Sequence, residues 1–297
     1  MLPNFLICGA PKAGTSSLHT WIAAHPDALG AIEKETYFCV DPGSHMYRPG
    51  ANILQGLQGY ERYFRLSKSQ RPNVVLESTP AYIYYETALR YVPGLPTKPK
   101  CLFLLREPAQ QIYSLFTYFQ SNWSWIPHDM RFSEYLEILR SGKTAGLFRG
   151  NELAQNALIN GHYVNFLLRW RDQLGPERIK VLSFDRLKDE SKLLTQEVAS
   201  WIGLEPSFYE TYDFPRDNET YAVRNKALQR LNVAVRGVLP RGVFYSSMRA
   251  IYRRLNTQSP SKPEPESHDL VAELAQDYAE SNARLRDEFG LDLPSWA

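Results

Sequence analysis

The residues best suited to chemistry near the start of the chain lie in the stretch FLICGAPKAGTSSL, residues 5–18. An apolar run leads into a segment with glycines at Gly9 and Gly14 and with Lys12 between them, and an amphipathic segment follows. This order predicts a strand, a turn and a helix start, where backbone N–H groups and the positive end of the helix dipole converge on an anion. The nucleoside-triphosphate loop G-x-x-x-x-G-K-[ST] places its lysine after the second glycine, where this chain has Thr15. We therefore expect a phosphate site whose lysine lies inside the loop.

A second candidate anion site follows another apolar run, CLFLL at residues 101–105. Arg106 comes directly after this run, and Ser114 lies further along, in a segment with a helical pattern. An arginine at a strand end can bind a phosphate dianion through two parallel hydrogen bonds, and a serine two turns along the next helix can add a neutral donor. The alternative is that Arg106 pairs with Glu107 or caps the helix. Two separated anion sites on one sheet fit a nucleotide that is phosphorylated at both ends.

Apolar runs that are typical of strands alternate with helical patterns along the chain. The strand-like runs are residues 5–8, 74–76, 101–105 and 179–184, and the helical patterns include residues 16–24, 108–120, 133–141, 151–174 and 192–202. This alternation predicts an α/β fold with a central parallel sheet covered by helices on both faces. Ligands bind such sheets beyond the carboxyl ends of the strands, where both anion sites are expected. A Pro- and Ser-rich linker, residues 257–267, precedes a predicted packed C-terminal helix, residues 269–289, so we expect one domain over residues 1–297.

Composition excludes several classes of protein. The 297 residues are 43% apolar and 13% aromatic, which is enough for a sizeable core, and a net charge of +2 is too small to imply a nucleic-acid partner. Cys8, Cys39 and Cys101 lack the spacing of a metal site, and a buried free thiol is the expected state of Cys8 and Cys101, which lie in apolar strand-like runs. The sequence contains neither a targeting segment nor an apolar run near the roughly 18 residues of a membrane span. We therefore expect a cytoplasmic protein with no transmembrane segment.

The two phosphate motifs, in this order and about 90 residues apart, resemble those of a known family. PKAGTSSL together with LLREPAQQIYSLF is similar to the sulfotransferases that use 3′-phosphoadenosine 5′-phosphosulfate (PAPS). HPDALGAIEKETYF and LESTPAYIYY resemble motifs of the heparan-type and bacterial branches, and GHYVNFLLRWRDQLGPERIKVLSFDRL and FGLDLPSW resemble later ones. The resemblance covers nearly the whole chain. It implies a single α/β domain that moves a sulfuryl group from PAPS to an acceptor hydroxyl, releases 3′,5′-adenosine bisphosphate (PAP) and needs no metal.

The resemblance also assigns nucleotide-binding roles. The P-loop-like first loop is expected to hold the 5′-phosphosulfate, and Arg106 with Ser114 the 3′-phosphate. Lys12 can stabilise the charge that develops on the oxygen bridging sulfur and phosphorus as that bond breaks. A late basic loop, YAVRNKALQRL here, is expected to close over the 3′-phosphate. The full set of expected nucleotide-binding residues is Pro11, Lys12, Ala13, Gly14, Thr15, Ser16, Ser17, Arg106, Ser114, Arg224 and Lys226.

The acceptor hydroxyl must lose a proton, and Glu35 in EKETYF is the expected base. A glutamate at the matching place serves that role in the heparan-type branch. Glu33 is the competing base, and the alternative to both is a solvated charged turn. Lys34 can help to position the sulfate. Tyr37 occupies a place that is often a histidine in this branch, and it either orients the acceptor hydroxyl or packs on the core.

The acceptor itself is indicated by one departure from the family pattern and by the expected pocket walls. Ser78 in ESTPAY replaces a lysine that contributes to anionic sugar binding in many heparan-type enzymes. The expected walls, residues 39–57 and 119–136, are aromatic and weakly charged. We therefore expect a small or amphipathic hydroxylated acceptor, free or bound to a carrier. Its expected contacts are Lys34, Tyr37, Ser78 and Trp123, whereas His128 and His162 are expected to be structural.

The stretch 224–256 contains eight Lys and Arg residues and no Asp or Glu. It predicts either a surface helix pair whose arginine stems cover the core, or a platform for an acidic partner or an anionic lipid surface.

Two rival functions are also compatible with the sequence. One is a P-loop nucleotide kinase, which would need ATP and Mg²⁺, and the other is a binding module that keeps the nucleotide pocket without catalysis. Retention of both Lys12 and Glu35 speaks against the latter.

Overall fold

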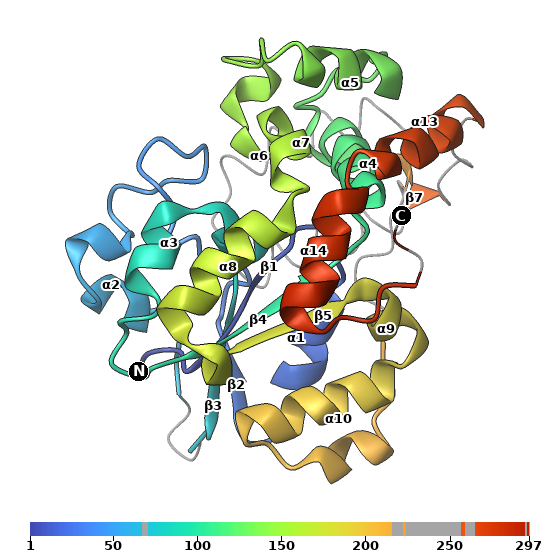
Figure 1. The fold of residues 1–297 in the computed structure, drawn as a ribbon. Helices are drawn as coiled ribbons and strands as arrows, with labels where there is room; N and C mark the ends of the chain where they lie inside the picture. The colour runs from blue at the N-terminus through green and yellow to red at the C-terminus, as the bar shows by residue number, and fades with distance from the viewer. Residues whose placement is uncertain (67–70, 216–221, 224–256, 259–264, 295, 297) are drawn as a thin grey trace.

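A sheet of five parallel strands in the order β2-β3-β1-β4-β5 runs through the centre of the molecule (Figure 1). The computed structural model describes residues 1–66, 71–215, 222–223, 257–258, 265–294 and 296. The strands of the sheet are β1 (Phe5–Gly9), β2 (Ala28–Gly30), β3 (Val74–Ser78), β4 (Lys100–Leu105) and β5 (Ile179–Ser183). The predicted α/β fold with a central parallel sheet is thereby confirmed. The short strand β2 was not predicted, because three residues are too few to show a strand pattern.

The central position belongs to β1, which pairs with β3 on one side and with β4 on the other. Phe5 lies opposite Leu76 of β3 and Lys100 of β4, so the three strands start and end at similar heights. Because all three are parallel, the segments that follow them meet at one edge of the sheet. The two predicted anion loops and the ESTP segment are these three segments.

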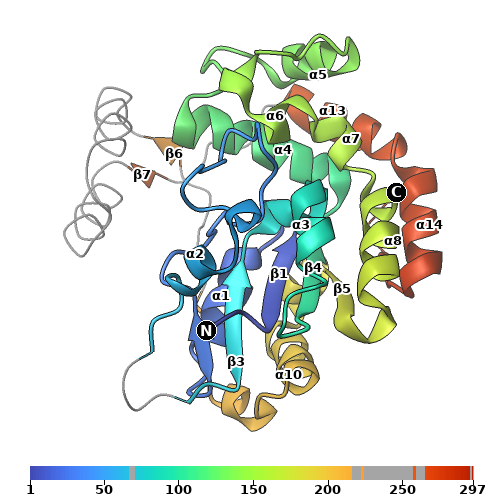
Figure 2. The same ribbon diagram turned by 90° about the vertical axis from the view of Figure 1, so that its left-hand side faces the viewer.

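Side chains of the strands alternate between two cores, one on each face of the sheet. Leu6 and Cys8 pack under α8 (Tyr163–Leu174), α14 (Ala279–Phe289) and α3 (Glu86–Tyr91). Phe5 and Ile7 pack on the opposite face, under α1 (Thr15–Ala23) and α10 (Ser191–Ile202). The helices therefore cover both faces, as Figures 1 and 2 show. Cys8 and Cys101 are buried free thiols, as predicted, and Cys39 is buried and free as well.

A third apolar cluster forms a cap beyond the carboxyl ends of the strands, at the top of Figures 1 and 2. It joins α4 (Pro108–Tyr118), α5 (Phe132–Arg140) and α13 (Pro265–Gln276) through side chains such as Phe116, Tyr135 and Leu274. The remaining described helices and strands are α2 (Gln58–Glu61), α6 (Glu152–Gln155), α7 (Ala157–Asn160), α9 (Phe184–Asp189), and the antiparallel pair β6 (Ala222–Val223) and β7 (Thr257–Gln258). Short 3₁₀ turns occur at residues 53–55, 80–84, 148–150, 176–178 and 206–210, and a π turn at residues 119–123.

Two predicted helices are broken in the structure. The predicted helix over residues 151–174 is three helices, α6, α7 and α8, and the predicted C-terminal helix over residues 269–289 is α13 and α14. The break between α7 and α8 meets the break between α13 and α14 at one contact, where the ring of Tyr278 lies against Gly161. A Cβ atom at Gly161 would lie 2.5 Å from that ring, and the Tyr278 hydroxyl donates to the carbonyl oxygen of Leu158 at 2.8 Å. The linker predicted over residues 257–267 ends earlier than expected, because α13 already begins at Pro265.

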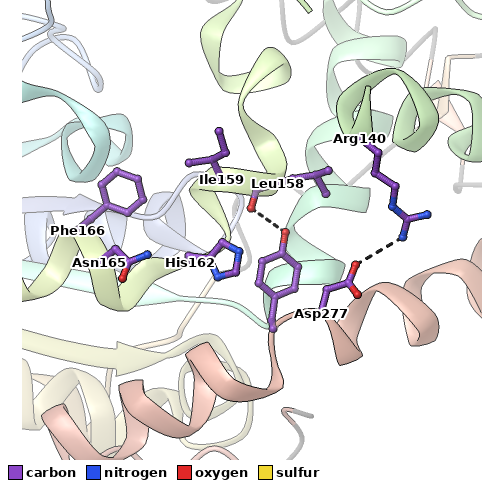
Figure 3. A pocket seen from close by; sticks show the side chains of 8 residues that line it. Arg140, Leu158, Ile159, His162, Asn165, Phe166 and Asp277 are labelled. Carbon is purple, nitrogen blue, oxygen red and sulfur yellow. Dashed lines mark hydrogen bonds and ion pairs between the residues drawn. The ribbon is translucent and has the colours of Figure 1, made fainter. Parts of the chain in front are cut away.

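A cavity of about 340 Å³ opens beside this contact (Figure 3). Its residues are Arg140, Leu158, Ile159, His162, Asn165, Phe166, Asp277 and Tyr278. The Arg140 guanidinium pairs with the Asp277 carboxylate at 3.5 Å, and the His162 ring packs on Tyr278 with ring centroids 4.9 Å apart. Among the described residues that are predicted to bind nucleotide or acceptor, none lines this cavity. In the part of the chain that the structure describes, no helix has the length and apolar character needed to cross a membrane.

Candidate active site

The first predicted anion site lies at the centre of the sheet, where residues 10–14 join β1 to α1. Gly14 is the N-cap of α1 and has φ 84°, and a Cβ atom there would lie 2.6 Å from Leu187 Cδ2, so both backbone and space require glycine. Among the described residues no side chain caps α1, and its first turn holds no acidic residue. The positive end of the helix dipole is therefore directed at the loop without a competing carboxylate.

Lys12 is half-buried, and its ammonium lies over the ring of Tyr118, with Nζ 4.1 Å from the ring centroid. Burial and, to a smaller extent, the charge of Arg106 lower the pKa of Lys12, whereas the charge of Glu35 opposes the shift, and the resulting pKa is about 8. The charges of Arg106 and Glu35 therefore both act on the Lys12 ammonium. The structure thus brings together residues from the first loop, from the end of β4 and from the EKETYF segment.

One face of α4 is turned toward the first loop. Gln111 Nε2 donates to the carbonyl oxygen of Pro11 at 3.1 Å, and Tyr118 contacts Lys12. Ser114 lies between them at helical spacings of three and four residues, so it shares this face. Gln111 and Tyr118 were missed by the sequence reasoning, although their spacing from Ser114 was the signal that could have found them.

Arg106 lies half-buried just beyond β4, as predicted. Glu107 caps α4 by accepting from two first-turn N–H groups at 2.7 and 3.0 Å, so it is committed to the helix, and no Arg106–Glu107 ion pair forms. Arg106 Nε is buried and has no hydrogen-bond partner among the described residues. The guanidinium carbon lies 5.2 Å from the centroid of the Phe184 ring, which also packs against Gly14. Phe184 is therefore shared by the two predicted anion sites.

The EKETYF segment separates its two candidate bases. Glu35 accepts from Lys34 Nζ at 3.2 Å and from the Tyr37 hydroxyl, whereas Glu33 pairs with Arg48 Nη1 at 3.5 Å. Glu35 is also the carboxylate whose charge acts on Lys12. Burial raises the pKa of Tyr37 well above its ordinary value, and the Glu35 charge raises it further, so Tyr37 is a donor to that carboxylate.

The structure does not support direct acceptor contact by Ser78. Its side chain is fully buried, because β3 extends two residues beyond the predicted end at Leu76. Ser78 Oγ lies 2.7 Å from His19 Nδ1, and burial lowers the pKa of His19 to about 3, which keeps that ring neutral. Ser78 is thus part of the support behind the site.

The two predicted walls of the acceptor pocket contact each other. Trp123 is half-buried and stacks on Trp125 with ring centroids 4.8 Å apart. Trp125 in turn meets the edge of His45 at 5.2 Å, which belongs to the other wall.

A cluster of hydrogen bonds that the sequence analysis did not predict connects the wall of residues 39–57 to α6. Glu152 accepts from His45 Nδ1 and from the Tyr85 hydroxyl, each at 2.5 Å, and from Ser44. Burial by itself would raise the pKa of Glu152, but these hydrogen bonds outweigh it and lower that pKa to about 2.

The other predicted nucleotide-binding residues fall into two groups. Thr15 is buried, whereas Pro11, Ser16 and Ser17 of the first loop and helix start are half-buried. Arg224 and Lys226, together with the basic stretch 224–256, lie outside the described residues. Within the ranges that the structure describes, no group of three His, Cys, Asp or Glu side chains is arranged to hold a metal ion. The metal-independent reaction stays a prediction.

The fold and the site together define an α/β protein that presents two neighbouring cations and a carboxylate beyond the ends of its central strands. The chain belongs to the sulfotransferase domain family, whose family model matches residues 2–230. The resemblance noted in its motifs is thereby confirmed, and sulfuryl transfer is the reaction class of that family.

Curated relatives include bifunctional heparan sulfate N-deacetylase/N-sulfotransferases. The chain is 25% identical over 215 residues to enzyme 1 of Caenorhabditis briggsae and covers 24% of that protein with 71% of its own length. It is 20% identical over 295 residues to human enzyme 2, and that alignment covers 99% of this chain and 31% of the relative. The chain thus spans about a quarter to a third of the length of these relatives. A solved sulfotransferase from Alicyclobacillus acidocaldarius shares the fold, with a TM-score of 0.67, 20% identity and coverage of 100% of this chain and 99% of the other.

Proposed function

We propose that this chain transfers the sulfuryl group of PAPS to an acceptor hydroxyl by in-line displacement. The observation that carries the proposal is that two half-buried cations, Lys12 and Arg106, follow the ends of the adjacent strands β1 and β4 without an acidic ion-pair partner among the described residues. Such cations lose hydration and gain a partner only when an anion binds. The first loop offers a helix N-terminus for the 5′-phosphosulfate, and Arg106 with Ser114 suits the 3′-phosphate.

In the proposed reaction, the acceptor oxygen attacks sulfur, and the bond from sulfur to the bridging phosphate oxygen breaks. The acceptor proton passes to the Glu35 carboxylate, and the electron pair of the broken bond stays on the phosphate of PAP. Lys12 stabilises that developing charge, because its ammonium can approach the bridging oxygen from inside the loop. Lys34 and Tyr37 orient Glu35, since each donates to one of its carboxylate oxygens.

The aromatic walls favour an acceptor with a flat or amphipathic body and a free hydroxyl. Trp123 and Trp125 offer ring faces and edges, and Ser78 adds no cation for an anionic sugar. An acceptor of this kind, free or bound to a carrier, is part of the proposal.

The direct test incubates the protein with PAPS and a panel of hydroxylated small molecules, including carrier-bound ones, and follows the gain of one sulfuryl group by mass spectrometry. A thermal-shift titration accompanies it, in which PAP should stabilise the protein and ATP with Mg²⁺ should not. Stabilisation by ATP with Mg²⁺ alone would favour a P-loop kinase. Stabilisation by PAP without any sulfated product across a broad panel would favour a binding module.

A further inference from the structure

The turn that carries the candidate base has an unfavourable backbone. Glu35 has φ 66° and Tyr37 has φ 54°, and neither is a glycine. A left-handed conformation costs about 1–2 kcal/mol at each such residue, so the turn persists only where its surroundings hold it. The question is which residues supply those contacts.

The contacts come from residues 77–79, which are the last two residues of β3 and the residue that follows them. The Glu35 N–H donates to the carbonyl oxygen of Ser78 at 2.9 Å, and the Tyr37 N–H donates to Thr79 Oγ1 at 3.4 Å. Between them, the Thr36 hydroxyl donates to Glu77 Oε1 at 3.0 Å. Each residue of the turn is therefore held by a different residue of the strand end.

One carboxylate oxygen of Glu77 accepts hydrogen bonds from both threonines. Its Oε1 accepts from Thr36 at 3.0 Å and also from Thr79 Oγ1 at 2.6 Å. The same Thr36 hydroxyl accepts from the N–H of Phe38 at 3.3 Å, which extends the anchoring beyond the turn. Thr36 and Thr79 would have no common acceptor without Glu77.

A fully buried carboxylate at this place needs an explanation. Glu77 is 0% exposed, has no ion-pair partner among the described residues, and its Oε2 has no hydrogen bond. Burial raises the pKa of Glu77 to about 7, and the hydrogen bonds from Thr79 and Thr36 hold it from rising further. An apolar side chain of similar size would avoid this cost of burial. Because its side chain reaches no surface, Glu77 does not contact substrate.

We infer that Glu77 is a positioning residue, which acts through Thr36 and Thr79 to fix the left-handed turn that presents Glu35 toward Lys12. The inference rests on the proposed role of Glu35. Without the carboxylate, the turn relaxes toward ordinary backbone angles, and Glu35 leaves the geometry needed to accept the acceptor proton.

The test compares Glu77→Met, Glu77→Gln, Thr36→Val and Thr36→Ser with Thr195→Val. Thr195 is a matched control, because it is also fully buried and its hydroxyl donates to a carbonyl of its own helix, that of Ser191, far from the turn. Glu77→Met removes the shared acceptor but leaves the acceptors of the Tyr37 and Phe38 amides in place. Hydrogen exchange on peptides covering residues 36–39 of the ligand-free protein therefore reports whether the carboxylate holds the turn.

We expect Glu77→Met and Thr36→Val to speed this exchange by about tenfold and to lower kcat by about tenfold or more, the size of one lost hydrogen bond. The KM for PAPS and the affinity for PAP should change by less than about twofold, because Glu35 does not hold the nucleotide. Thr36→Ser and Glu77→Gln, which keep a hydroxyl and an acceptor oxygen, should recover most of the turnover. Thr195→Val should match the wild type in exchange and turnover.

Wild-type exchange at residues 36–39 in Glu77→Met would overturn the inference, as would faster exchange with unchanged kcat. If Glu77→Met does not fold, the kcat of Thr36→Val against that of Thr36→Ser decides, and equal turnover in the two would overturn the inference; exchange in Thr36→Val is not diagnostic, because that variant also removes the acceptor of the Phe38 amide. Failure of the proposed function would be seen separately, as normal turnover in Glu35→Gln or as no sulfated product from the wild type.

Discussion

Lys12 combines two requirements that oppose each other. It must be desolvated enough to act strongly on a nearby charge, and it must stay protonated when the leaving phosphate forms. Its pKa of about 8 lies just above neutral pH, and the Tyr118 ring compensates part of the lost hydration. Lys12 therefore carries its charge at neutral pH but can lose it in mildly alkaline solution.

Replacing Lys12 should affect chemistry more than binding. We expect Lys12→Ala to lower turnover by at least about 10²-fold, or about 2.7 kcal/mol of transition-state stabilisation, while PAP affinity falls much less. Steady-state kinetics and calorimetric PAP titration measure the two effects. Near-normal turnover in this variant would mean that the first loop does not hold the leaving group.

Because the pKa of Lys12 is lowered, we also expect the protein to take up a proton when it binds PAP. The ammonium is charged below about pH 8 and neutral above it, and bound phosphate raises its pKa again. PAP affinity should thus fall as pH rises through about 8, by up to about tenfold per pH unit, and binding at pH 8 should take up part of a proton. Calorimetry in two buffers of different ionisation enthalpy measures the uptake. Lys12→Ala is the control, in which the uptake should vanish.

The two glutamates of EKETYF can be distinguished by matched substitutions. Glu35→Gln keeps the shape of the side chain but removes the basic oxygen, so turnover should fall by about 10²–10⁴-fold with nearly unchanged PAP affinity. Glu33→Gln should stay active, because Glu33 is engaged with Arg48. An inactive Glu33→Gln beside an active Glu35→Gln would move the base by two residues, and activity in both would remove the role from this segment.

At the scale of elements, the junction of β4 with α4 connects the two predicted anion sites. Arg106 ends the strand, Glu107 caps the helix, and the helix face that follows carries Gln111, Ser114 and Tyr118 toward the first loop. One junction therefore sets both the expected 3′-phosphate contact and the support for Lys12.

Arg106→Ala should discriminate between nucleotides. It should weaken PAPS and PAP by about 1.5–3 kcal/mol, the size of a charge-assisted pair, and barely affect adenosine 5′-phosphosulfate, which lacks the 3′-phosphate. Competition binding with the three nucleotides measures this, and Ser114→Ala should show a smaller loss in the same direction. Equal losses for all three would assign Arg106 a structural role.

At the scale of the whole molecule, the C-terminal segment closes the core beside the candidate active site. Trp296 is 4% exposed, packs near Tyr163, and donates its Nε1–H to Asp185 Oδ2 at 3.0 Å. Asp185 follows Phe184, the ring beneath Arg106. The far end of the chain thus supports α9, which in turn contacts both anion sites.

Removing this contact should lower global stability. We expect Trp296→Ala to lower the free energy of unfolding by about 3–5 kcal/mol, through lost packing and the cavity that remains. Trp296→Phe keeps a ring but loses the N–H donor, so its cost should be nearer about 1 kcal/mol. Urea unfolding with an unchanged m-value measures both. A loss below about 1 kcal/mol for Trp296→Ala would show that the segment is not part of the core.

The sequence by itself determined the parallel sheet, the first loop and the place of Arg106. These features are written in neighbouring residues: an apolar run, a glycine turn and a helix start are local patterns that follow from backbone hydrogen bonding. The exclusion of an Arg106–Glu107 pair was not visible there, because it depends on Glu107 being used as a helix cap.

Only the tertiary structure decided which distant side chains meet. Thr36 and Glu77 are 41 residues apart, and Lys12 and Tyr118 about 100, so neither contact leaves a periodic signal. The same holds for Tyr278, which interrupts one predicted helix and packs on Gly161 in the break of another. Ser78 was expected at the acceptor because its neighbours fit a motif, yet the extra length of β3 buries it. Local propensity selects the elements, whereas burial and packing between them determine which polar groups face the site and which support it from behind.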